Sequence, residues 1–298
     1  MSDFTSEFWS WFIIAIVGGG MIWLIWILAS NTKTTGEEGV PTGHVWDETL
    51  EELNNPLPRW WSIMFYVTIF FSIGYLIMYP GMGSFKGLLG WTEVGQYEQE
   101  VADADAEFGP LFEKFENTPI PVLAKDADAM VAGERLYASY CAVCHGADAR
   151  GAPGFPNLRD GDWLYGGSPE QIHATIMNGR QAAMPAWDAP LGGEKGVAEV
   201  AAYVMSLSGR KVDTALADAG KAKFEMFCVA CHMEGGKGNQ AMGAPNLTDT
   251  IWLYGGSERT IRESIAKGRN GKMPAHGEFL GSAKVHVLAA YVYSLSQE

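Results

Sequence analysis

All four cysteines of the chain lie in two copies of one short pattern, Cys-X-X-Cys-His. The residues of the two copies are Cys141, Cys144, His145, Cys228, Cys231 and His232. In this pattern two cysteine sulfurs can form thioethers with haem, and the adjacent histidine supplies an iron ligand. The sequence therefore predicts two covalently attached haems c, one at each copy.

Two other chemistries use paired cysteines, namely a thioredoxin-like redox site and a zinc site. The redox site requires a strand followed by a helix, which neither sequence context indicates. A shared zinc ion would require the two pairs to meet, whereas each pair lies in its own repeat with its own histidine. We therefore favour haem attachment.

A sequence repeat that begins near residue 126 indicates the remaining iron ligands. The segment Trp-Leu-Tyr-Gly-Gly occurs at 163–167 and at 252–256, and in both halves a Met-Pro-Ala segment follows. The interval is 21 residues in each half, from 163 to 184 and from 252 to 273. A methionine thioether closes the iron to other ligands and raises its reduction potential. The repeat therefore predicts Met184 and Met273 as axial ligands.

Other side chains offer alternatives to these methionines. His276 and His286 could ligate the second iron in place of Met273, but neither has a histidine counterpart in the first half, and we expect structural or exposed roles. Methionine usually fills space in a core, and we interpret the unrepeated methionines in this way.

Each half of the repeat is expected to be helical and small. One short helix runs into each Cys-X-X-Cys-His pattern, one follows Ser168 or Ser257, and the last carries Ala-Ala-Tyr-Val. The two serines are predicted N-caps, and Gly179 and Gly268 are predicted helix ends. Because about 80 residues form a limited apolar core, a buried macrocycle would add to it.

Two apolar segments precede the repeats, at 8–29 and 60–79, and neither contains a charged residue. Each is long enough to cross a bilayer, for which about 20 residues suffice, and both carry interfacial Trp or Tyr. A cleaved signal peptide is disfavoured for the first, because no Lys or Arg precedes it and its apolar run is too long. Since neither segment contains histidine, this chain offers no intramembrane ligand pair for b-type haem or copper.

These observations predict a mainly α chain with two transmembrane helices and two tandem cytochrome c domains. The net charge of −14, from 35 acidic and 21 basic residues, argues against nucleic-acid binding. The predicted parts are a tail with the first transmembrane helix (1–29), a cytoplasmic loop (30–59), the second transmembrane helix (60–80), an acidic linker or exposed helix (81–125), and cytochrome c domains at 126–210 and 211–298.

The whole chain resembles the dihaem subunit, called subunit III or subunit P, of cbb3-type cytochrome c oxidase. Its haem-binding half is shared with many dihaem cytochromes. The more specific likeness precedes it, in Gly-His-Val-Trp-Asp at 43–47, Leu-Asn-Asn-Pro-Leu-Pro-Arg-Trp-Trp at 53–61 and Tyr-Pro-Gly at 79–81. The first transmembrane helix is a departure, because many members have only the second.

The resemblance implies a non-catalytic electron-transfer subunit with two class I cytochrome c domains. Electrons would pass from soluble cytochrome c to a monohaem subunit and then to a catalytic subunit with haem b and copper, which reduces oxygen to water. The resemblance assigns Cys141, Cys144, His145 and Met184 to the first haem. It assigns Cys228, Cys231, His232 and Met273 to the second.

The resemblance also implies a location in the bacterial inner membrane with the haem domains on the periplasmic side. Two spans then place both termini in the periplasm, and Lys33 and Arg59 between the spans agree with the positive-inside rule. Two other functions remain open at this point. One is a membrane-tethered dihaem shuttle or the cytochrome subunit of a dehydrogenase, and the other is a haem enzyme or gas sensor with an exchangeable ligand.

Overall fold

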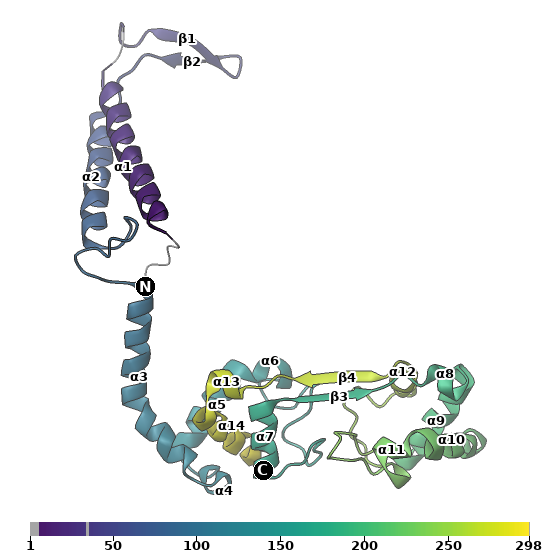
Figure 1. Ribbon diagram of the computed structural model, residues 1–298. Helices are drawn as coiled ribbons and strands as arrows, with labels where there is room; N and C mark the ends of the chain where they lie inside the picture. The colour runs from purple at the N-terminus through teal and green to yellow at the C-terminus, as the bar shows by residue number, and fades with distance from the viewer. Residues whose placement is uncertain (1–5, 34–35, 298) are drawn as a thin grey trace. The chain divides into compact units, whose positions relative to one another are not determined.

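The computed structural model describes residues 6–33 and 36–297, so that the predicted tail at 1–5 and parts of the loop and C-terminus lie outside the described residues. The described chain is mainly helical, as predicted (Figure 1). It divides into two units, Met1–Glu107 and Phe108–Glu298, and each is described separately.

The first unit contains the two predicted apolar helices, α1 (Glu7–Ser30) and α2 (Arg59–Met78). Both are long and apolar enough to cross a membrane. Only Ser10 and Leu28 of α1 are buried, and only Ser62 and Ile69 of α2. Helices that expose apolar side chains on nearly all sides are suited to a lipid environment.

The predicted loop between these helices contains a β-hairpin that the sequence pattern does not indicate. Strands β1 (Pro41–Trp46) and β2 (Leu50–Leu53) pair antiparallel, and every residue of both is exposed. The turn residues Asp47 and Glu48 have φ angles of 51° and 66°. Because no face of the hairpin is buried, it lacks the alternation of apolar and polar residues that would mark a half-buried strand.

The predicted acidic linker is largely one helix, α3 (Glu93–Glu116), followed by the short α4 (Ile120–Leu123). The end of α3 and α4 belong to the second unit, where Phe115 and Leu123 are almost completely buried. The last part of the predicted linker is therefore part of a folded core.

The second unit has two lobes, joined by a pair of strands (Figure 1). The first lobe consists of α5 (Ala127–Tyr140), α6 (Ala142–His145), α7 (Pro169–Asn178), α13 (Gly277–Leu280) and α14 (Ser282–Leu295). The second lobe consists of α8 (Asp188–Leu191), α9 (Glu194–Leu207), α10 (Thr214–Phe227), α11 (Val229–His232), the 3₁₀ turn η1 (Glu234–Gly236) and α12 (Glu258–Lys267).

The joining strands are β3 (Arg180–Met184) and β4 (Arg269–Met273), which pair antiparallel along their whole length. Each strand starts with an arginine whose guanidinium carbon lies 4.7 Å from the centre of a tyrosine ring, Tyr165 or Tyr254. Each helix before a strand begins and ends as predicted, with Ser168 and Ser257 as N-caps and Gly179 and Gly268 at the C-caps.

The strands carry the chain from one lobe to the other, so that each lobe contains parts of both repeats. Helix α14, from the second repeat, packs on α5 and α7 of the first repeat, and α9 packs on α10 and α12. The segments predicted as domains, 126–210 and 211–298, are therefore not two separate bodies in this structure. The repeats exchange the helices that follow their strands.

Candidate haem-binding sites

Each Cys-X-X-Cys-His segment forms a single helical turn at the end of a longer helix. Cys141 is the C-cap of α5 and Cys228 is the C-cap of α10, and all four cysteines are free thiols of intermediate burial. Burial, followed by the neighbouring thiol of the same pair, raises the pKa of Cys141 and of Cys228 to about 11. A raised pKa keeps these two thiols protonated at neutral pH, unlike the low-pKa cysteines of redox-active pairs.

The two motif histidines are held in the same way. The Nδ1 atom of His145 lies 2.9 Å from the carbonyl oxygen of Pro156, and that of His232 lies 3.1 Å from the carbonyl oxygen of Pro245. A carbonyl can only accept, so Nδ1–H donates and Nε2 is left with its lone pair for a metal. Burial lowers the pKa of both imidazoles, which favours the neutral, ligating form.

The two predicted methionine ligands lie in the opposite lobes from those that the resemblance implies. Met273 packs against the first-lobe core together with Cys141. Met184 packs against the second-lobe core together with Cys228. Strands β3 and β4 thus place each methionine in the lobe that contains the cysteine pair of the other repeat.

The two histidines that could replace Met273 as ligands both lie in the first lobe. His276 is 9% exposed, lies in the first lobe and has its Nδ1 atom 2.9 Å from the carbonyl oxygen of Pro274. Burial is the main cause that lowers the pKa of the His145 imidazole, and the charge of the nearby His276 lowers it further. His286 Nε2 lies 2.8 Å from the carbonyl oxygen of Thr118. Neither histidine lies in the second lobe, which contains the second Cys-X-X-Cys-His motif.

The repeated tryptophans are further parts of these sites. Trp163 packs against the first-lobe core and Trp252 against the second-lobe core, alongside the respective cysteine. Each lobe thus combines a free cysteine pair, a histidine with an oriented ring, a methionine and an apolar wall, and this set of groups fits a c-type haem. Zinc is disfavoured further, because no three His, Cys, Asp or Glu side chains at 6–33 and 36–297 form a metal-binding group.

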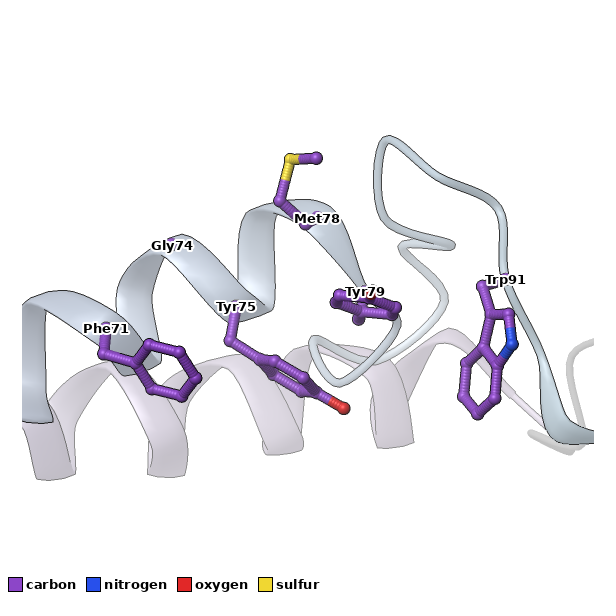
Figure 2. A pocket seen from close by; sticks show the side chains of 6 residues that line it. All are labelled: Phe71, Gly74, Tyr75, Met78, Tyr79 and Trp91. Carbon is purple, nitrogen blue, oxygen red and sulfur yellow. The ribbon is translucent and has the colours of Figure 1, made fainter.

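An open aromatic groove lies far along the chain from both motifs, on α2 (Figure 2). The Tyr75 and Tyr79 rings are stacked with centroids 4.8 Å apart, and the Trp91 ring meets Tyr79 edge-on at 5.9 Å. Such aromatic groups are typical of the membrane–water interface. The groove carries no cysteine or histidine, so it adds no ligand to the haem sites.

Two family models match different parts of the chain. The family model for the N-terminal domain of cytochrome oxidase-cbb3, FixP, matches residues 38–86. The model for cytochrome C oxidase, cbb3-type, subunit III, matches residues 128–204 and 215–292, once in each repeat.

Similar proteins extend the likeness over the whole chain. A cbb3-type cytochrome c oxidase subunit CcoP of Rubrivivax gelatinosus is 49% identical over 100% of this chain and 98% of its own length. A subunit FixP of Azorhizobium caulinodans is 41% identical, covering 85% of this chain and 92% of its own length. The chain therefore belongs to the family of cbb3-type cytochrome c oxidase subunit III, a cytochrome c electron-transfer subunit of the terminal oxidase.

Proposed function

We propose that the chain carries two covalent haems c and relays electrons from a soluble cytochrome c to the other subunits of a cbb3-type oxidase. The observation that carries this proposal is the duplicated Cys-X-X-Cys-His turn, in which each histidine ring is fixed by a proline carbonyl. Two equivalent sites in one chain form a relay rather than a single reaction centre.

The roles of the residues follow from their positions. Cys141 and Cys144 hold one haem and Cys228 and Cys231 the other, while His145 and His232 each present Nε2 to iron. Met184 and Met273 supply the remaining ligands. When bound, haem with such ligands exchanges one electron at a time. The apolar cores around the sulfur atoms exclude water and favour the less charged, reduced state.

The proposed partners in the oxidase are a catalytic subunit with haem b and copper and a monohaem cytochrome c subunit. Family membership supports this, and the absence of histidine from the two apolar segments, 8–29 and 60–79, means that other subunits must provide intramembrane ligands. We propose that the haem domains and both termini are periplasmic in the bacterial inner membrane. The basic residues Lys33 and Arg59 between the spans support this orientation.

Purification of the complex in mild detergent, with haem types counted by absorption, tests the proposal. We expect two c-type haems per copy of this chain, together with b-type haem from a partner and oxygen consumption. Replacing both cysteines of either pair by alanine should leave one c-type haem on the chain. Isolation of the chain alone, without b-type haem or oxygen consumption, would instead support a tethered shuttle or a dehydrogenase subunit.

Carbon monoxide distinguishes electron transfer from ligand chemistry. Two irons that are each closed by methionine should not bind carbon monoxide in the reduced protein at neutral pH. Binding at both haems of the intact chain would contradict the methionine assignments and favour a sensor or peroxidase.

A further inference from the structure

The loop after each Cys-X-X-Cys-His motif contains the proline whose carbonyl oxygen orients the motif histidine. We call these loops the first haem loop (146–158) and the second haem loop (233–247). Two residues before its proline, each loop has a glycine, Gly154 in the first and Gly243 in the second. Their φ angles are 90° and 70°, a backbone region that favours glycine. The path of the loop at these glycines therefore sets the position of each proline carbonyl.

Each of these glycines is covered by a tyrosine of the other repeat. The Tyr165 ring lies so close to Gly243 that a Cβ added to this glycine would collide with the ring. Tyr254 lies over Gly154, but there an added Cβ would remain 3.4 Å from the nearest ring atom. Gly243 is buried and Gly154 is half-buried. The two contacts are thus equivalent in the repeat, and the one made by Tyr165 is the closer.

Hydrogen bonds between the lobes accompany both ring contacts. Gln240 of the second haem loop donates its Nε2–H to the carbonyl oxygen of Trp163 at 3.1 Å. The Gly154 backbone N–H of the first haem loop donates to the carbonyl oxygen of Leu253 at 2.8 Å. Trp163 packs in the first-lobe core beside its cysteine pair, and Trp252 does so in the second. Each Trp-Leu-Tyr segment therefore packs beside one cysteine pair and binds the haem loop of the other.

An arginine at the start of a strand holds the tyrosine ring in place. The Arg180 guanidinium carbon lies 4.7 Å from the centre of the Tyr165 ring, and its Nε–H donates to Thr175 Oγ1 at 2.9 Å. The Tyr165 hydroxyl lies 3.5 Å from the Gln181 carbonyl oxygen, at the outer limit of a hydrogen bond. The ring atom nearest to a Cβ at Gly243 is Cζ, which phenylalanine also has. The ring, rather than the hydroxyl, is therefore the part that holds the loop.

We propose that Tyr165 and Tyr254 are positioning residues that act between the lobes, each holding the haem loop whose proline carbonyl orients the motif histidine of the opposite lobe. Tyr165 acts on His232, and Tyr254 acts on His145. The acceptor bonded to a ligating histidine fixes its ring orientation and raises its basicity, and both tune the metal. Because the Tyr165 contact is the closer, the second haem site depends more on the first lobe than the first site depends on the second. This inference rests on the proposed function and concerns its histidine ligands.

The test uses full-length chains that carry a single haem, obtained by replacing both cysteines of one motif by alanine. Tyr165→Leu and Tyr254→Leu are introduced separately into each background, with Tyr165→Phe as the conservative control. The first readout is the set of electron paramagnetic resonance g values of the oxidised iron, which report the orientation and basicity of the histidine ring. The second is the midpoint reduction potential. Both measure the iron ligands themselves, so a variant that is only less stable leaves them unchanged.

When only the second haem is present, we expect Tyr165→Leu to shift the g values and to raise the potential, because a looser carbonyl makes the imidazole a weaker electron donor. Tyr165→Phe should leave both near their original values. When only the first haem is present, Tyr165→Leu should have no effect and Tyr254→Leu should cause a smaller shift. Unchanged signals of the second haem in Tyr165→Leu, or equal changes in both backgrounds, would overturn the inference. Absence of covalent haem from the unsubstituted chain would instead overturn the proposed function.

The two glycines test the same contacts from the other side, and they cover a Tyr165→Leu chain that fails to accumulate. Alanine at either glycine strains a backbone with positive φ, but only at Gly243 does its methyl group collide with a tyrosine ring. In the two-haem chain, Gly243→Ala should therefore shift the g values of the second haem more than Gly154→Ala shifts those of the first. Gly243→Ala combined with Tyr165→Leu should shift them less than the sum of the two, because both changes act on one contact. A larger effect of Gly154→Ala, or additive shifts, would overturn the inference.

Discussion

The two lobes have the same helices at equivalent places, yet they are stabilised differently. In the first lobe the final helix, α14, buries a continuous apolar run, and the end of α3 and α4 add Phe115 and Leu123. In the second lobe the equivalent helix, α9, includes the buried Glu199, which is paired with Lys223. The same fold thus accommodates an apolar side chain, Val287, or a paired glutamate, Glu199, at the same position of the final helix.

The largest contrast is expected from truncating equivalent core side chains. Leu288 and Val200 both directly precede the Ala-Ala-Tyr-Val segment, and both are buried. Leu288→Ala should lower the free energy of unfolding by about 2–5 kcal/mol, because the site is tightly enclosed. Val200→Ala removes one carbon fewer and should cost less. Denaturant unfolding of the full chain in detergent, followed by haem absorption, measures both; an equal or larger effect at Val200 would contradict this order.

A second contrast lies where α14 crosses α5 in the first lobe and where α9 crosses α10 in the second. A Cβ at Gly133 would meet the Tyr291 side chain, whereas one at Gly220 would meet the backbone of Glu199 and Val200. Because backbone yields less readily than a side chain, Gly220→Ala should destabilise by about 1–3 kcal/mol, and Gly133→Ala by less. Thermal unfolding of the two variants compares them, and a more stable Gly220→Ala chain would refute the predicted close contact.

The residue that follows the motif histidine provides a third contrast. It is Gly146 in the first lobe but Met233 in the second, where φ is 63° and ψ is 168°. This backbone region is nearly restricted to glycine and costs about 1–3 kcal/mol for other residues. Met233→Gly should therefore stabilise the second lobe, and Gly146→Ala should destabilise the first. Denaturant midpoints of both variants provide the measurement; destabilisation by Met233→Gly would show that its side-chain contacts outweigh the strain.

The smallest expected effect is on the pH dependence of stability. Burial, followed by the charge of His286, lowers the pKa of His173 in the first lobe, while nearby Glu116 opposes the shift. The equivalent residue in the second lobe is Arg262. The unfolded state binds this proton more tightly than the folded state does. The contribution of His173 to stability is therefore fully present above the normal histidine pKa of about 6.5, and it decreases as pH falls through the lowered pKa of the folded protein.

His173→Gln should therefore reduce the loss of stability between neutral and mildly acidic pH. Denaturant unfolding at pH values on both sides of the histidine range measures this, with Arg262→Gln as the matched control that should leave the dependence unchanged. An undiminished acid dependence in His173→Gln would exclude this histidine as its source.

Much of this architecture follows from local sequence. The capping residues Ser168 and Ser257, the apolar helices and the duplicated motifs each depend on neighbouring residues, and the structure contains each of them. The exchange of helices is different, because both repeats present the same local signals. Because both repeats contain the same pattern of helices, repeat spacing alone cannot identify whether α9 pairs with α5 or with α10. The short segments of β3 and β4 pair only with each other and carry no alternating apolar pattern.

Cleavage of the exposed connection between α9 and α10 tests the exchange of halves most directly. A protease site placed between Gly209 and Lys211 would separate the two repeats as polypeptides without removing a haem ligand. We predict that the cut halves stay together in detergent without denaturant and keep both methionine–iron bands, because each lobe contains parts of both. Separation into two stable fragments, each with one complete His/Met haem, would contradict the exchange.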